Sequence, residues 1–380
     1  MSKTVVRRIT ATPVRVPARP DSLNSPGIEE TDRKFAEKFH TGASWTDFPL
    51  EIKWIVEMET ADGACGIGET YRGPTREQVE ADLRPFAGKD VLELEWRHLP
   101  VRDMRIYDAV ESAVLDLAGK KFGVPVYQLL GGACRDRVET SGWTGRRTPE
   151  DAARKAFEAM QAGHRVFKFK CSDKDSVRDW STKIRERCGS GIKLLLDPNQ
   201  RWHDAATTLR LMEGVDPDIM YALEDPVERT DFAGFREVRK ALGIPMYIHI
   251  SNPYSQNMGD VITALREDAI DGFNFNGPMI QFVELASTAA LAGMNCWHGS
   301  EVDLGILEVS ALHAAAAAPN CTVPSDIFGE LVREDDLIVE PIRFERAHAL
   351  VPQGVGLGIE LDRAAVERYR AGGSIVIENS

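Results

Sequence analysis

Between residues 166 and 298, short apolar runs end in polar residues at a nearly constant spacing. The runs end at Lys170, Asp197, Glu224, His249, Asn276 and His298. Successive members of this set are 27, 27, 25, 27 and 22 positions apart. A strand of about five residues, a helix of about eleven and two short loops fill a step of this length. The spacing therefore predicts consecutive βα units closing into a parallel α/β barrel.

The carboxyl ends of barrel strands meet at one mouth, where barrel enzymes carry their active sites. Residues that close successive apolar runs are therefore expected to converge there. The converging set contains lysines, acids, histidines and amides. This composition predicts a metal site surrounded by acid and base groups.

Length and charge limit the possible functions. A chain of 380 residues favours two domains, and a hydrophobic fraction of 43% is ordinary for a globular protein. The formal net charge of -13 argues against nucleic acid and anionic membranes as partners. The charge does not exclude an acidic partner such as a small-molecule carboxylate, which would bind through local lysine, arginine or metal charge.

The cysteines and the N-terminus favour a cytoplasmic protein. The six cysteines include no CxxC pair, so we interpret them as reduced thiols. The first residues, MSKTVVRRITATPVRVP, contain no apolar stretch long enough for a signal peptide, and no segment is long enough to span a membrane.

The first part of the chain has a different pattern. Residues 4–16 and 50–60 alternate apolar and polar side chains, which predicts antiparallel strands with one wet face. The polar stretch 17–49 between them is predicted to be a lid loop. Helical periodicity follows at 75–86 and 107–122.

These patterns predict the domain organisation. Residues 1–132 are expected to form an α+β capping domain, and residues 133–352 the catalytic barrel. The segment 353–380 is expected to return to the capping domain.

Several motifs occur in a characteristic order. They are the segment AVESAVLDLAGKKFGVPVYQLLGG at 109–132, KxK at Lys168 and Lys170, DxN at Asp197 and Asn199, EDP from Glu224, and GLGIELD at 356–362. In this order the chain resembles the enolase superfamily, in its mandelate racemase and muconate lactonizing branch. The resemblance implies an N-terminal capping domain over a (β/α)7β barrel, a Mg²⁺ site, and removal of a proton next to a carboxylate. It also implies a homo-oligomer.

The expected metal ligands are oxygen donors from neighbouring strands. Asp197 and Glu224 are of the type that magnesium prefers. Members of this branch usually supply a third acid from the fifth strand, where this chain offers His249 or Ile250. His249 is the candidate ligand, and imidazole also suits Mn²⁺. The alternative is a metal site that has decayed.

The candidate base lies on the KxK strand. Residues two apart on a strand point to the same side, so Lys168 and Lys170 are expected to face the same space. Mutual repulsion and partial burial are expected to lower one pKa toward neutrality. By family position Lys170 is the proton carrier, and Lys168 tunes it or holds the substrate carboxylate.

His298 takes the family position of the opposing acid or base. Its partner on the sixth strand is an aspartate in the mandelate racemase pattern, whereas this chain has Asn276. A neutral amide does not stabilise a histidine cation as a carboxylate does. We therefore expect His298 to protonate a departing hydroxyl, which favours dehydration over two-base racemisation.

Substrate contacts are expected from polar residues near the strand ends and on the lid loop, because arginine forks grip carboxylates well. The candidates are Asn199, Arg201, Asn276, Arg146, Glu301, Arg33 and His40.

These expectations combine into one functional prediction, a Mg²⁺-dependent acid-sugar dehydratase that forms a 2-keto-3-deoxy acid from an aldonate or aldarate. The first alternative is a racemase, epimerase or cycloisomerase of the same superfamily. The second is a non-catalytic binding relative with an altered site.

Overall fold

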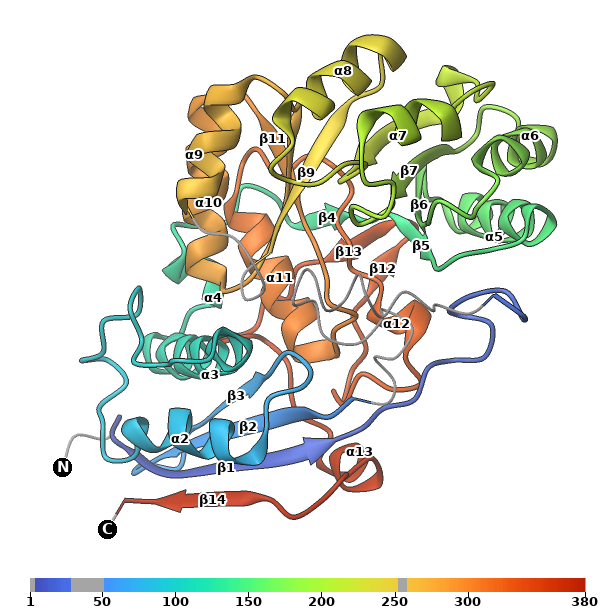
Figure 1. The fold of residues 1–380 in the computed structure, drawn as a ribbon. Helices are drawn as coiled ribbons and strands as arrows, with labels where there is room; N and C mark the ends of the chain where they lie inside the picture. Colours follow the sequence, from blue (N-terminus) through green and yellow to red (C-terminus); the bar gives the residue numbers. More distant parts are fainter. Residues whose placement is uncertain (1–3, 29–50, 252–257, 380) are drawn as a thin grey trace.

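The computed structural model describes residues 4–28, 51–251 and 258–379. The chain forms an antiparallel sheet with two packed helices, and beside it a curled parallel sheet surrounded by helices (Figure 1). The first and the last strand of the chain both lie in the antiparallel sheet, which we call the cap sheet. The predicted mixed α/β architecture is confirmed.

The cap sheet has the strand order β14-β1-β2-β3. It contains β1 (Val6–Val14), β2 (Lys53–Thr60), β3 (Cys65–Glu69) and β14 (Ile375–Glu378). The strands predicted within 4–16 and 50–60 are therefore confirmed, whereas β3 was not predicted. Strand β14 pairs antiparallel with β1, so the end of the chain returns to the cap sheet.

Two helices follow the cap strands. Helix α2 (Arg76–Leu83) begins at the Thr75 capping box and continues as a 3₁₀ turn, η2 (Arg84–Phe86). Helix α3 (Met104–Phe122) begins at the Asp103 cap and ends at Gly123, whose φ of 70° suits a left-handed C-cap. The second predicted helix thus starts three residues earlier than expected.

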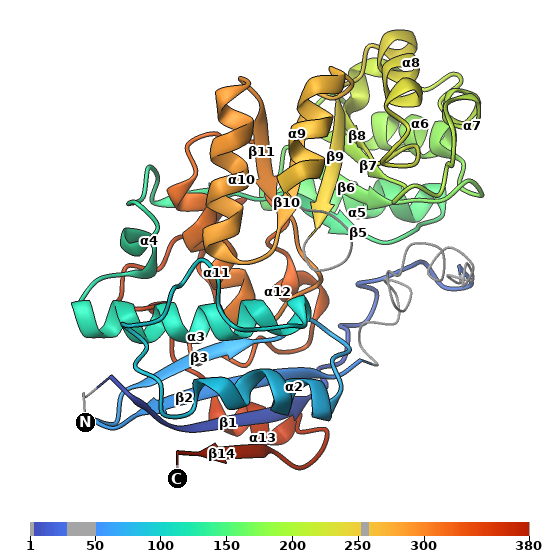
Figure 2. The same cartoon turned by 60° about the vertical axis from the view of Figure 1, so that its left-hand side comes forward.

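Helix α3 lies between the cap sheet and the barrel helices (Figure 2). Its approach to β3 depends on two glycines of that strand. A Cβ atom at Gly66 would lie 2.1 Å from the Ala113 carbonyl oxygen, and one at Gly68 would lie 1.9 Å from the Ala109 carbonyl oxygen. Only glycine therefore permits this contact between the backbones of helix and strand.

The parallel sheet has the order β11-β10-β9-β8-β7-β6-β5. Its strands are β5 (Gly142–Thr144), β6 (Val166–Lys170), β7 (Lys193–Asp197), β8 (Met220–Glu224), β9 (Met246–Ser251), β10 (Gly272–Asn276) and β11 (Asn295–His298). The intervening helices are α5 (Pro149–Ala162), α6 (Val177–Cys188), α7 (Ala205–Leu211), α8 (Phe232–Leu242), α9 (Met258–Glu267), α10 (Met279–Leu291) and α11 (Gly305–Ala317), with the 3₁₀ turn η3 (Pro217–Ile219) before β8.

The eighth strand of the predicted barrel is replaced by an irregular segment, residues 320–326. It makes isolated parallel bridges on both sides, pairing Cys321 with Cys296 of β11 and Ser325 with Thr140 beside β5. Pro324 lies within it and has no N–H to donate, which explains why regular pairing is interrupted. Val323 nevertheless packs inside the barrel with Trp297.

Short elements complete the fold. They are α4 (Val126–Leu129), the antiparallel group β4 (Arg137–Glu139), β13 (His348–Leu350) and β12 (Phe344–Glu345), and helices α12 (Gly329–Val332) and α13 (Arg363–Arg368). All six cysteines are free thiols. Across the described residues, no helix has the length and apolar character needed to cross a bilayer.

Two acids from the cap side bind the N-termini of barrel helices. Glu69 of β3 accepts the backbone N–H groups of Leu304 and Leu307 at the start of α11. Glu111 of α3 accepts those of Met279 and Ile280 at the start of α10. Acidic side chains are favourable hydrogen-bond acceptors at helix N-termini. These contacts fix the loops that follow β10 and β11, at the end of the barrel that carries the site.

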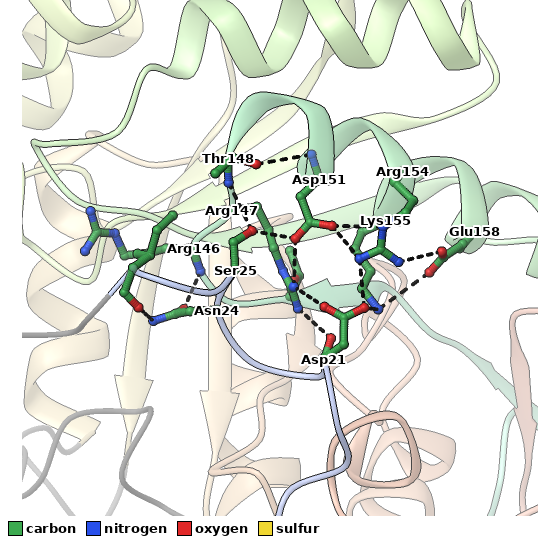
Figure 3. A network of polar contacts seen from close by, with 12 residues as sticks. Asp21, Asn24, Ser25, Arg146, Arg147, Thr148, Asp151, Arg154, Lys155 and Glu158 are labelled. Carbon is green, nitrogen blue, oxygen red and sulfur yellow. Dashed lines mark hydrogen bonds and ion pairs between the residues drawn. The ribbon is translucent and has the colours of Figure 1, made fainter.

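The described part of the predicted lid loop is tied to the barrel (Figure 3). Asp21 pairs with Arg147, Arg154 and Lys155, and Ser25 donates to Asp151 at the start of α5. These ion pairs hold the pKa of Asp21 below its usual range although partial burial opposes this. Residues 29–49 of the predicted loop lie outside the described residues.

Candidate active site

The interior of the barrel contains one cation surrounded by three acids. Lys168 Nζ lies 2.6 Å from Glu224 Oε2, 2.7 Å from Asp326 Oδ2 and 3.3 Å from Asp197 Oδ2. Burial works against the charge of Lys168, but Asp326, Glu224 and Asp197 together raise its pKa well above the usual value. Its neighbours are mainly acids, so Lys168 is not the lysine of the pair whose pKa is lowered.

Lys170, at the end of β6, lies on the same side of the strand. Its Nζ donates to Asp197 Oδ2 at 2.5 Å and to Asn199 Oδ1 at 2.7 Å. Both lysines of the KxK motif therefore contact Asp197, in agreement with the two-residue period of a strand. The Lys170 side chain is 15% exposed, compared with 3% for Lys168, so it is the more accessible of the pair.

The two acids at the ends of β7 and β8 have opposite pKa shifts. Burial would raise the pKa of Asp197, but Lys170 and Lys168 hold it below its usual range. Burial and the charge of Asp197 raise the pKa of Glu224 to about 8, although Lys168 opposes this. With Asp326, the site therefore holds three acids against the two lysines Lys168 and Lys170.

The turns after these strands adopt left-handed backbone conformations. Asn199 has a φ of 47° and Asp225 a φ of 46°. Asparagine and aspartate tolerate this region better than most residues. The Asn199 turn brings its side chain to Lys170, and Asp225 Oδ1 accepts the backbone N–H of His249 at 3.0 Å.

His249 of β9 joins the same group. Its Nδ1 lies 3.7 Å from Glu224 Oε1, and its Nε2 lies 3.3 Å from Asn276 Oδ1. Burial, together with the charges of Arg229 and Lys168, holds the pKa of His249 well below its usual value. Nδ1 is buried and has no hydrogen-bond partner among the described residues.

The donor atoms offered by Asp197, Glu224 and His249 are of chemical types that bind a divalent cation. Two carboxylates and an unpartnered imidazole nitrogen form a set that Mg²⁺ tolerates and Mn²⁺ accepts readily. As they stand, no three His, Cys, Asp or Glu side chains of the described residues are grouped as a metal site. Lys168 Nζ lies between Asp197 and Glu224 and bridges them.

His298 is not brought to this group. It pairs in register with Phe275, whereas Trp297 pairs with Asn274. Trp297 packs inside the barrel, so His298 faces the helices and stacks on Phe282 of α10 at 4.5 Å. The sequence prediction selected the last residue of the strand, but the alternation of side chains places its neighbour inside.

The protonation of His298 also differs from the prediction that a charged imidazole acts as the acid. Its Nδ1 lies 2.7 Å from the Gly299 carbonyl oxygen, which only accepts. Burial lowers the pKa of His298 to about 4, although this hydrogen bond opposes the shift. The imidazole is therefore neutral at neutral pH.

Asn276 does not contact the imidazole of His298, although it occupies the position of the histidine's partner in the mandelate racemase pattern. Its Oδ1 faces His249, and its Nδ2 donates to Glu301 Oε1 at 3.1 Å. Glu301 Oε2 pairs with Arg72 Nη2 at 3.3 Å. Arg72 follows β3, so a residue from the cap side reaches the barrel site.

The remaining predicted contacts have varied settings. Arg146 is held by both carboxylate oxygens of Asp175, each at 2.9 Å. Arg201 is buried in the loop after β7. Arg33 and His40 lie outside the described residues.

Asp326 and Arg72 were missed by the sequence prediction, and Asn274, which lies in the apolar run ending at Asn276, was given no role in the site. Asp326 lies 28 positions after His298, a step that continues the βα spacing and would have revealed it. Asn274 donates to Glu224 Oε1 at 2.7 Å and shares a strand with Asn276, so the alternation of side chains places both inside. Arg72 has no such signal, because it comes from outside the barrel repeat.

Several known proteins are similar to this chain over most of its length. The family model described as enolase C-terminal domain-like matches residues 151–365, more than half of the chain. The chain is 27% identical to an N-succinyl-L-Arg/Lys racemase of Bacillus cereus over 85% of this chain and 91% of that protein. It is 29% identical to an L-Ala-D/L-Glu epimerase of Bacillus subtilis over 80% and 88% of the two chains.

A dehydratase is among the similar proteins too. A D-gluconate dehydratase of Thermoproteus tenax is 24% identical over 90% of this chain and 74% of that protein. The crystal structure of the Bacillus cereus racemase superposes with a TM-score of 0.81 at 22% identity, covering 98% of this chain and 100% of that one. The chain therefore belongs to the enolase superfamily, in its mandelate racemase and muconate lactonizing branch.

Proposed function

We propose that this protein removes the proton next to the carboxylate of a small acid, and that the reaction is the dehydration of an acid sugar. The observation that carries the proposal is the interior group of Lys170, Lys168, Asp197 and Glu224 at the ends of successive strands. Relatives in the same family include isomerases and a dehydratase.

The proton next to a carboxylate is very weakly acidic, because its removal concentrates charge on the carboxylate oxygens. Asp197, Glu224 and His249 are the residues that would hold a divalent cation here. When bound, Mg²⁺ or Mn²⁺ would supply positive charge to those oxygens. Lys168, kept charged by its three acids, adds a fixed cation to the same space.

Lys170 is the proposed base. Its Nζ is the more accessible of the two ammonium groups, and within the described part of the chain it donates to Asp197 and Asn199. Neutral Lys170 takes the α-proton, and the C–H electron pair forms the double bond of the enediolate. The β-hydroxyl then leaves with the proton that the Lys170 ammonium returns, and the resulting enol tautomerises to the ketone.

Dehydration is favoured because it needs only one residue that removes a proton from carbon. A two-base isomerase requires a second proton carrier facing Lys170. The interior side chains on β10 and β11 include Asn274, Asn276 and Trp297, none of which takes a proton from carbon, and His298 faces the helices. The proposed mechanism therefore no longer uses His298 as the acid.

A second candidate is isomerisation, supported by the racemase and epimerase relatives and by Glu301. This acid lies beside Asn276, and burial raises its pKa although Arg72 opposes the shift. A carboxyl group at this position is able to exchange a proton. The two reactions differ in product, because only dehydration creates a ketone.

The test is a screen of purified protein with Mg²⁺, and separately Mn²⁺, against mono- and diacid sugars, with new ketone detected as a semicarbazone. We expect at least one acid sugar to give ketone, with activity lost on adding EDTA and in Lys170→Ala. Lys174→Ala is the matched control, since Lys174 is an exposed lysine in the loop after the same strand. Deuterium uptake without ketone would favour isomerisation. The absence of both ketone and deuterium uptake would reject both reactions.

A further inference from the structure

A chain of polar contacts runs from the cap side to the imidazole of His249. Arg72 Nη2 lies 3.3 Å from Glu301 Oε2, and Glu301 Oε1 lies 3.1 Å from Asn276 Nδ2. The other end of the Asn276 amide, Oδ1, lies 3.3 Å from His249 Nε2. All four side chains are largely buried from water, so their polar atoms depend on these contacts for hydrogen-bond partners.

The chemistry of these groups gives each contact one direction. Arginine only donates, so Glu301 Oε2 accepts from Arg72, and Glu301 Oε1 accepts from the amide nitrogen of Asn276. Asn276 must therefore turn its amide nitrogen toward Glu301 and its oxygen toward His249. An amide oxygen only accepts, so His249 Nε2 carries the hydrogen, and Nδ1 of the uncharged ring carries a lone pair.

That lone pair faces another acceptor. Nδ1 has no hydrogen-bond partner among the described residues, and the nearest acid oxygen is Glu224 Oε1 at 3.7 Å. Glu224 Oε1 already accepts from Asn274 Nδ2. Two ligand atoms bound to one Mg²⁺ or Mn²⁺ at about 2.1 Å lie roughly 3–4 Å apart. The separation therefore suits a shared cation.

We infer that Asn276, Glu301 and Arg72 are positioning residues that fix the tautomer of His249, so that Nδ1 serves as a ligand for a divalent cation. The inference rests on the metal site of the proposed function. It accounts for a histidine on the fifth strand, because the neighbouring strand supplies the acceptor that a histidine ligand requires. It also gives the cap side a part in the metal site through Arg72.

The first experiment observes the tautomer without metal. Protein labelled with ¹⁵N-histidine is studied by two-bond ¹H–¹⁵N correlation, and the His249 signals are assigned by their loss in His249→Asn. We expect a pyridine-type Nδ1 and a pyrrole-type Nε2 in the wild type. A protonated Nδ1 in the neutral ring would overturn the inference.

The second experiment uses Asn276→Leu and Glu301→Gln. Leucine has about the size of asparagine and removes the acceptor, and glutamine offers a donor that allows the Asn276 amide to reverse. We expect a mixed tautomer in both variants and a Mn²⁺ dissociation constant raised at least tenfold, measured by the EPR signal of free Mn²⁺. Glu345→Gln, an exposed partner of Arg137, is the control and should leave both values unchanged.

The outcomes separate this inference from the proposed function. Unchanged tautomer and Mn²⁺ affinity in both variants would overturn the positioning role while leaving the metal site intact. A wild type that shows the expected tautomer but binds no Mn²⁺ would reject the metal site, and with it the ligand role of Nδ1. If Asn276→Leu fails to fold by circular dichroism, the near-isosteric Glu301→Gln decides alone.

Discussion

Lys168 Nζ lies 2.6 Å from Glu224 Oε2, in an interior where Asp197 and Asp326 contact the same nitrogen. The ammonium group of Lys168 therefore forms ion pairs with three buried acids. Its charge offsets only part of theirs, which is consistent with the raised pKa of Glu224. The group is arranged to accept further positive charge, whether from Lys170, a proton or a metal ion.

Replacing Lys168 with Met should strongly destabilise the protein. The change leaves three acids without the cation they share, and breaking a buried ion pair costs about 3–5 kcal/mol. Urea unfolding near neutral pH measures the loss, with Lys174→Met as the exposed control. We expect Mg²⁺ to recover part of the stability. An unfolding midpoint equal to that of the wild type would contradict the electrostatic role of Lys168.

Lys170→Ala should instead affect catalysis with little effect on stability. Lys170 lies at the mouth, and Asp197 keeps Lys168 as a partner when it is removed. Loss of a general base typically lowers the rate by 10²–10⁴-fold. Once a substrate is found, kcat with unfolding curves measures both effects. A variant as active as the wild type would exclude Lys170 as the base.

The sequence predicted the residues that depend on strand spacing and missed those that depend on tertiary contacts. Lys168, Lys170, Asp197 and Glu224 were placed together because strand ends of a barrel converge. His298 was misplaced because spacing locates the end of a strand without deciding which of its last two residues faces inward. Arg72 approaches from the cap side, and only the packing of α3 and β3 against the barrel brings it there.

His298→Phe tests that correction. Phenylalanine retains the stacking on Phe282 and loses only the hydrogen bond to the Gly299 carbonyl. Because His298 faces the helices, we expect kcat/KM within a few-fold of the wild type and a modest loss of stability, about 1 kcal/mol. The measurement is steady-state kinetics on the substrate found by the screen. A loss of 100-fold or more would return His298 to the mechanism.

Glu111 should make the stability of the protein depend on pH. Burial raises its pKa to about 8, although the N–H groups of Ile280 and Met279 oppose the shift. The folded state therefore holds a proton that the unfolded state, with a pKa near 4.5, has released. The resulting stabilisation is fully present below pH 4.5 and is lost as the pH rises toward 8, at roughly 1.4 kcal/mol per pH unit at most.

The measurement is the urea-unfolding free energy of the wild type and of Glu111→Gln between pH 5 and pH 8. Glutamine stays uncharged throughout and keeps one acceptor for the start of α10, so its stability should fall less steeply over this range. Glu345→Gln, which changes an exposed acid, should keep the wild-type slope. Equal slopes in Glu111→Gln and the wild type would mean that Glu111 stays ionised between the cap and α10. The two N–H donors of α10 would then suffice to hold a buried charge.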